Sequence, residues 1–315
     1  MLAAYQLEHN HLRKTRLSIN DDIPDGTIWI DALEPDEDER NWLSGHFVGG
    51  LPGQEKVDEI EASSRFFTDQ DGLHINSLFP HKVGQELRSF NVSLNLRVDR
   101  LISVRGEDLS LFRLLRQYLR QDRIHAAGPM ELLLHLFALK VDYLSDSIED
   151  VYKILGPASE QVFETDGLDE LLRMITRQED SNGKIRLSLL DTQRTLRFLQ
   201  RYQIDKLSKD NKRQIREMLS DIESLLPHTQ FLFDKINFML DATMSFTNLQ
   251  QSKIIKIFSV AAVVFLPPTL IASIYGMNFN IMPELQQSWG YPMALGMMVA
   301  SAFGTYYFFK RKDWL

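Results

Sequence analysis

The sequence predicts an α+β domain followed by a long stalk helix and two transmembrane helices. Two stretches near the C-terminus predict the spans, because no charged residue occurs in the 27 positions between Lys256 and Glu284 or in the 25 between Glu284 and Lys310. A helix needs ~20 apolar residues to cross a bilayer. Upstream of these stretches, apolar residues recur at helical spacing from about residue 129 onward, whereas short apolar runs separated by turn signals fill the first 125 residues.

The first predicted domain, residues 1–125, has a mixed α/β pattern. Short apolar runs predict a strand at 27–31, an acidic helix at 35–47 and two hairpins at 64–79 and 91–104. The expected architecture is a mostly antiparallel sheet with helices on one face.

The remainder of the chain is predicted to be helical. Its segments are a helical region at 126–205, a stalk helix at 206–275 that becomes the first span at about 254–275, a loop at 276–290, a second span at 291–310 and a basic tail at 311–315. Gly156-Pro157 is expected to break the first of these helices, with the pattern resuming over 168–202. A continuous helix over 210–274 would be roughly 95 Å long at ~1.5 Å per residue, with a bend at Pro227.

The charge distribution predicts the orientation of the chain. Residues 253–315 hold five basic and two acidic side chains, which leaves 30 basic and 41 acidic in residues 1–252, a net charge of −11. This acidic excess argues against a nucleic-acid partner and is compatible with cationic ligands, although it also serves solubility. The N-terminus has no signal-peptide pattern, and basic residues flank both spans but not the loop, so both termini are expected in the cytoplasm. The absence of cysteine fits a reducing compartment.

Two spans per chain predict a homo-oligomer, since two helices cannot enclose a water-filled path. The first span carries a stripe of polar residues and is expected to line the axis, while the second is expected to face lipid. The predicted pore-lining residues are Ser252, Ile255, Phe258, Leu266 and Thr269. Apolar rings can gate a pore by dewetting. The alternatives stay open: hydroxyls in membrane helices often bond to their own carbonyls, and apolar residues contact lipid or other helices.

The loop after the first span contains a specific motif. It begins with YGMNF at residues 275–279 and continues with MPEL at 282–285; FLPPT at 265–269, WGYP at 289–292 and the closing KRKDWL surround it. In these segments the chain resembles the CorA magnesium-channel family, and the likeness extends over nearly the whole chain. The resemblance implies a funnel-shaped homopentamer in the bacterial inner membrane. It also implies potential-driven Mg²⁺ influx, with Co²⁺ and Ni²⁺ as further substrates.

The predicted selectivity filter is Gly276, Met277 and Asn278. Mg²⁺ releases its water shell reluctantly and prefers octahedral oxygen coordination. Rings of Asn278 side-chain carbonyls and Gly276 main-chain carbonyls would accept hydrogen bonds from the waters of a hydrated ion. Gly276 is expected to permit a close backbone approach and an unusual φ after the helix, and Met277 to pack rather than bind. Glu284, the only charge in the loop, would attract cations, or would simply be solvated.

Regulation by cytoplasmic Mg²⁺ is a further implication of the resemblance. A divalent ion relieves the repulsion between carboxylates that face each other across a subunit interface. The candidate regulatory acids are Glu217 and Asp221 on the stalk and Asp241 nearer the membrane. Their partners in the first domain are expected among residues 58–61.

Two other classes remain as alternatives. The first is Zn²⁺ transport, as in a related branch of the family similar to ZntB. A Zn²⁺ site would favour a cluster of His and Cys ligands, whereas the eight histidines here are scattered and cysteine is absent. A membrane-anchored sensor would need no motif in the outer loop. An enzyme is not expected, because the sequence has no HExxH, no phosphate-binding glycine loop and no GxSxG motif.

Overall fold

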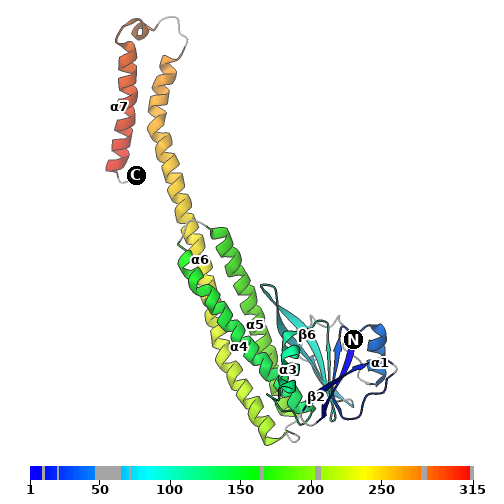
Figure 1. Cartoon of the computed structure of the whole chain (residues 1–315). Coiled ribbons are helices and arrows are strands. Elements are labelled where there is room, and N and C mark those ends of the chain that lie inside the picture. Colours follow the sequence, from blue (N-terminus) through cyan, green and yellow to red (C-terminus); the bar gives the residue numbers. More distant parts are fainter. Residues whose placement is uncertain are drawn as a thin grey trace. The chain divides into compact units, whose positions relative to one another are not determined.

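A computed structural model describes residues 1–8, 11–19, 21–46, 65–70, 72–163, 167–202, 207–277 and 282–312. The chain divides into two compact units, Met1–Leu240 and Asp241–Leu315 (Figure 1).

The first unit is built on a seven-stranded sheet with the strand order β2-β1-β3-β7-β6-β5-β4. Its strands are β1 (Leu2–Glu8), β2 (His11–Leu17), β3 (Thr27–Leu33), β4 (Phe66–Asp69), β5 (Gly72–Val83), β6 (Glu86–Leu96) and β7 (Leu101–Arg105). β3 and β7 pair in parallel, and every other pair is antiparallel. The predicted strand, both predicted hairpins and the mostly antiparallel sheet are confirmed, whereas sequence reasoning missed the β1–β2 hairpin.

Helices cover both faces of this sheet, so the prediction of helices on one face is wrong. Helix α1 (Glu37–His46) places Leu43 in a core cluster with Ile30 and Ala32 of β3. On the opposite face, Trp29 of β3 contacts Phe112 of α3 (Ser110–Arg120), another element that the sequence did not indicate. β3 is buried on both faces because it lies at the parallel pairing in the middle of the sheet.

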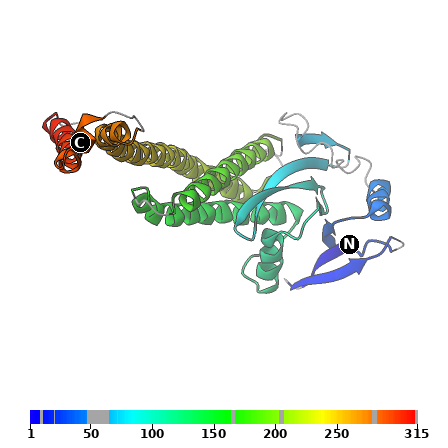
Figure 2. The same cartoon turned by 90° about the horizontal axis from the view of Figure 1, so that it is seen from above.

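Helices α4 (Pro129–Gln161) and α5 (Leu168–Tyr202) lie side by side (Figures 1 and 2). α5 has the predicted bounds. α4 continues through Gly156-Pro157, so the predicted break is wrong. A proline removes only one main-chain hydrogen bond, and buried Leu155 and Ala158 hold the last turns of the helix in the core.

Helix α6 spans Lys209–Tyr275, 67 residues, as the stalk prediction required. In the part of the chain that the structure describes, it is the one helix long and apolar enough to cross a membrane, and the apolar window of 18 residues is fully outside the core. A short 3₁₀ helix, η2 (Pro283–Gln286), follows, and then α7 (Gly290–Arg311). α7 coincides with the second predicted span, whose membrane crossing stays a prediction.

Candidate functional site

The motif turn begins where α6 ends. The Gly276 N–H donates to the Ala272 carbonyl at 2.9 Å, and the Met277 N–H donates to the Ile274 carbonyl at 3.3 Å, so the helix closes with one tighter turn. The expected unusual φ at Gly276 is wrong, because its backbone is not left-handed. The glycine does permit the expected close backbone approach, since a Cβ there would lie 3.1 Å from the Ala272 oxygen. Asn278 lies outside the described residues.

One side of α6 carries the five predicted pore-lining residues. At 100° per residue they fall within an arc of about 120°, and all five are exposed in the single chain, Phe258 at 71% and Leu266 at 65%. The Thr269 hydroxyl donates to the Phe265 carbonyl at 2.7 Å. This bond uses the hydroxyl proton and leaves lone pairs on the oxygen, which can still accept hydrogen bonds from the waters of a cation. The arrangement is thus compatible with a helix face beside a hydrated path.

The polar residues of α7 bond within their own helix. The Ser301 hydroxyl donates to Met298, and the Thr305 hydroxyl donates to Ser301, both at 2.8 Å to the main-chain carbonyl. Such internally satisfied hydroxyls can face an apolar medium. Glu284 lies in η2 and is exposed.

The candidate regulatory acids do not form one cluster. Glu217 pairs with Arg213 on the same helix at 3.7 Å, and Asp241 is exposed. Asp221 is close to Asp142 of α4, a residue that sequence reasoning did not select. Burial raises the pKa of the Asp142 carboxyl, and Asp146 and Asp221 raise that pKa further.

The structure provides no preformed ligand set around these acids. Within the described residues, no group of three or more His, Cys, Asp or Glu could hold a metal ion. The expected partners at 58–61 lie outside those residues. The signal for Asp142 was its recurrence with Asp146 at helical spacing, but only the fold brings this pair near Asp221.

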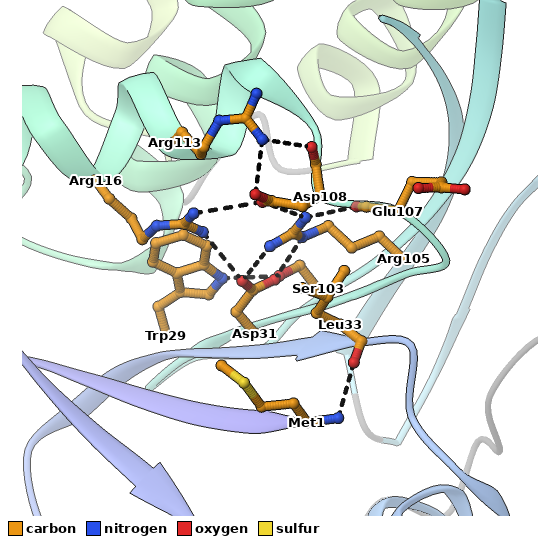
Figure 3. A network of polar contacts seen from close by, with 10 residues as sticks. All are labelled: Met1, Trp29, Asp31, Leu33, Ser103, Arg105, Glu107, Asp108, Arg113 and Arg116. Carbon is orange, nitrogen blue, oxygen red and sulfur yellow. Dashed lines mark hydrogen bonds and ion pairs between the residues drawn. The ribbon is translucent and has the colours of Figure 1, made fainter. Parts of the chain in front are cut away.

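Two buried charge networks hold the first unit together. In Figure 3, Asp31 accepts hydrogen bonds from the Arg105 guanidinium at 2.8 and 3.0 Å and from the Ser103 hydroxyl at 2.8 Å. Arg116 of α3 lies 3.4 Å from the same carboxylate, and Asp108 links Arg105 to Arg113. The network thereby joins α3 to the middle of the sheet.

The second network surrounds Asp191 of α5. Its carboxylate accepts hydrogen bonds from Arg65 at 2.9 Å and from the Ser77 hydroxyl at 2.6 Å, and it lies 3.5 Å from the Lys140 ammonium of α4. Lys140 is fully buried against the ring of Phe79. Burial lowers the pKa of Lys140 to about 8, although Asp191 opposes the shift. The central carboxylates of both networks, Asp31 and Asp191, are buried and structural, and neither lies on a candidate path for an ion.

The fold has a counterpart among solved structures. The chain resembles the solved CorA magnesium transporter from Methanocaldococcus jannaschii, with a TM-score of 0.75 and 19% identity over 100% of this chain and 99% of that one. This likeness shows the fold.

The sequence comparisons show the family. The chain is 45% identical over 320 residues to the magnesium transport protein CorA of Escherichia coli K12, and 44% identical over 319 residues to that of Yersinia pseudotuberculosis, with all of each chain covered. The family model described as CorA-like Mg²⁺ transporter protein matches residues 24–311. The chain belongs to this family, so the resemblance drawn from its motifs is confirmed.

Proposed function

We propose that this chain is the subunit of a Mg²⁺ channel that passes the ion across a membrane under an inside-negative potential. One observation carries the proposal. Full-length identity of 44–45% to magnesium transport proteins coincides with YGMNF at the C-terminal end of the one helix of the described chain that is apolar enough for a span. Mg²⁺ is the transported substrate, and Co²⁺ and Ni²⁺ pass as hydrated ions of similar size.

The filter acts on the hydrated ion. Asn278 side-chain oxygens and Gly276 carbonyls, repeated around an axis, accept hydrogen bonds from the first water shell of Mg²⁺. Because these oxygens are dipoles rather than full charges, the ion is bound weakly enough to leave. The absence of a side chain at Gly276, where α6 ends, is consistent with a backbone that approaches the ion closely. Glu284 raises the local cation concentration at the mouth.

Five copies surround the path, with α6 innermost and α7 as the second span. The exposed apolar residues of α6 support this arrangement, because a single chain leaves them without a core. Leu266, Phe258 and Ile255 form rings that gate by dewetting. Both termini lie in the cytoplasm of a bacterial cell, and the loop at 276–290 lies outside the inner membrane.

Regulation involves carboxylates on the stalk. The raised pKa of Asp142 reflects burial and then repulsion from Asp146 and Asp221, and a bound divalent ion would relieve that repulsion. Cytoplasmic Mg²⁺ at Asp221 and Glu217, which lie one turn apart, or at Asp241 about 30 Å further along the helix, together with acids of a neighbouring copy, then favours the closed state.

The test is ion uptake by the full chain reconstituted into vesicles. An inside-negative potential should drive Mg²⁺ uptake, and Mg²⁺ inside the vesicle should suppress it. Asn278→Ala should reduce uptake on the order of tenfold or more, the scale of one lost hydrogen bond to a charged group. Asn280→Ala is the matched control, since it removes the same side chain two residues away. Equal uptake by wild type and Asn278→Ala would contradict the filter.

Zinc transport is the alternative that the same vesicles exclude or support. In the described residues, no group of three or more His, Cys, Asp or Glu side chains could hold a metal ion directly. This favours a hard, hydrated ion over Zn²⁺, which prefers direct N and S ligands. Uptake that prefers Zn²⁺ and follows a proton gradient would replace the magnesium proposal. A membrane-anchored sensor would show no uptake of either ion.

A further inference from the structure

A slot opens between α6 and α7 in the second unit. It is a cavity of about 390 Å³, within the ~300–1,000 Å³ range of small-molecule sites. Its lining consists of Lys256, Ser259, Val260 and Val263 of α6 and Phe309 of α7. The four α6 residues follow an i, i+3, i+4, i+7 pattern and therefore form one continuous face of the helix.

The chemistry of this slot changes along the helix. Lys256 stands at the end toward the stalk and is exposed, and Ser259 lies one turn further on. Val260 and Val263 continue the lining toward the middle of the apolar stretch, and the Phe309 ring lines the α7 side. A cation and a hydroxyl at one end, with aliphatic and aromatic surface beyond them, match a molecule with an anionic head and a hydrocarbon tail.

The surrounding charge favours an anion at the same end. Lys253 precedes the slot on α6, and Lys310, Arg311 and Lys312 follow Phe309. No acidic residue occurs between Asp241 and Glu284, and the one acid near the basic end of α7 is Asp313, which lies outside the described residues. Basic pockets between transmembrane helices at the cytoplasmic surface are sites for anionic lipid headgroups.

We infer that the slot binds an anionic phospholipid. The phosphate of its headgroup lies against Lys256 and accepts a hydrogen bond from Ser259, while one acyl chain follows Val260 and Val263 beside Phe309. This inference rests on the proposed function in one respect, the placement of α6 and α7 in the membrane with their basic ends at the cytoplasmic leaflet. It assigns the two-helix unit a lipid ligand in addition to its ion.

The slot is centred to one side of the proposed ion path. Taking 100° per residue, Lys256, Val260 and Val263 lie about a quarter turn around α6 from Ile255 and Leu266, and Ser259 lies at the boundary between the two faces. A lipid in the slot would therefore contact α6 and α7 without covering the apolar rings. Its binding can be removed by substitutions that leave the pore-facing residues unchanged.

The test is lipid binding to the full chain purified in a neutral detergent and titrated with phosphatidylglycerol or with phosphatidylcholine of the same acyl chains. Intact-mass measurement of the complexes gives the dissociation constants. Lys256→Gln should weaken phosphatidylglycerol binding about fivefold, the contribution of one interfacial cation, and leave phosphatidylcholine unchanged. Lys253→Gln, one turn nearer the stalk and outside the lining, is the matched control and should weaken binding less than Lys256→Gln does, because its charge acts only from a distance. Val260→Phe fills the slot and should weaken both lipids.

Three outcomes would overturn the inference. These are equal affinity for the two lipids in the wild-type chain, equal losses from Lys256→Gln and Lys253→Gln, or full binding in Val260→Phe. Displacement of phosphatidylglycerol by free inorganic phosphate at an equal concentration would also overturn the inference, because it would show that the acyl chain contributes nothing to binding. Because the titration contains no Mg²⁺ gradient, a chain that binds the lipid but takes up no Mg²⁺ counts against the proposed function alone.

Discussion

The two units of this chain differ in what they enclose: the first buries some charged side chains within its core, whereas the second leaves large apolar side chains exposed. The first unit encloses charges, with Asp31, Arg105 and Lys140 each less than 5% exposed. The second leaves apolar side chains uncovered, with Phe258 and Leu266 more than 60% exposed. A buried charge requires a complete set of partners within the same chain, and the first unit supplies them. Exposed apolar helices require a cover from outside the chain, and lipid and further copies are the covers that the proposed function supplies.

The largest effect is expected from breaking a buried network in the first unit. Asp31→Asn removes the charge that Arg105, Arg116 and Ser103 share, and breaking a buried ion pair costs ~3–5 kcal/mol. Urea unfolding of the full chain in detergent, monitored by tryptophan fluorescence, measures the loss in the free energy of unfolding. Asp108→Asn is the control, because Asp108 contacts Arg105 but is 44% exposed, and it should cost less than ~1 kcal/mol. Equal, small losses of stability in Asp31→Asn and Asp108→Asn would mean that burial of the Asp31 ion pair does not increase its contribution to stability.

The next comparison places the same substitution in each unit. Leu136→Ala empties a fully buried position on α4 and should lower the free energy of unfolding by ~2–5 kcal/mol. Leu266→Ala removes an exposed side chain and should change that free energy by less than ~0.5 kcal/mol, while raising the ion leak through the proposed gate. A large loss of stability from Leu266→Ala, with flux unaltered, would place Leu266 in a core rather than beside a path.

The Lys140 ammonium should make stability depend on pH. Its pKa is about 8 in the folded chain and ~10.5 unfolded, so between these values the unfolded state binds more protons. The free energy of unfolding therefore rises with pH across this window, by about 3 kcal/mol from this group. Lys140→Met should lack this dependence, so the free energy of unfolding of the wild type relative to the variant should rise between pH 7.5 and pH 10. An unchanged difference between pH 7.5 and pH 10 would show that Lys140 titrates as an ordinary lysine.

Local patterns predicted most of the fold, and long-range contacts explain the misses. β3 followed from a short apolar run, because it is buried on both faces, and α5 followed from helical periodicity, because it buries one repeating set of residues. The β1–β2 hairpin was missed because β2 carries three basic residues among its seven and no glycine turn signal separates it from β1. Lys140 and Asp191 stand 51 positions apart, and nothing in either local pattern predicts that they meet.

The candidate site likewise contains some features that the sequence predicts and others that depend on the fold. The YGMNF motif could be found from the sequence alone, since a filter needs few residues at one turn. The proximity of the Asp142 and Asp221 carboxylates could not be predicted from the sequence, because it arises only when α4 and α6 pack together. The slot at Lys256 likewise needed both helices, since Phe309 reaches it from 53 positions along the chain.

The smallest effect is expected where α4 approaches the stalk. The folded pKa of Asp142 is raised, so its ionised form opposes folding at neutral pH. Asp142→Asn should therefore raise the free energy of unfolding at pH 7, by only a few tenths of a kcal/mol because the group is partly solvated. Its advantage should fade as pH falls into the acid range, where the wild-type carboxyl takes up its proton.

The control for Asp142 is Glu149→Gln on the same helix. Glu149 pairs with Lys153 at 3.5 Å on the surface, so this change should slightly lower stability, the opposite sign. Millimolar Mg²⁺ should stabilise the wild type more than Asp142→Asn if the ion relieves the repulsion between Asp142 and Asp221. Loss of stability in Asp142→Asn at pH 7 would instead show that this carboxylate already has a favourable partner, and the stalk acids would then regulate nothing through it.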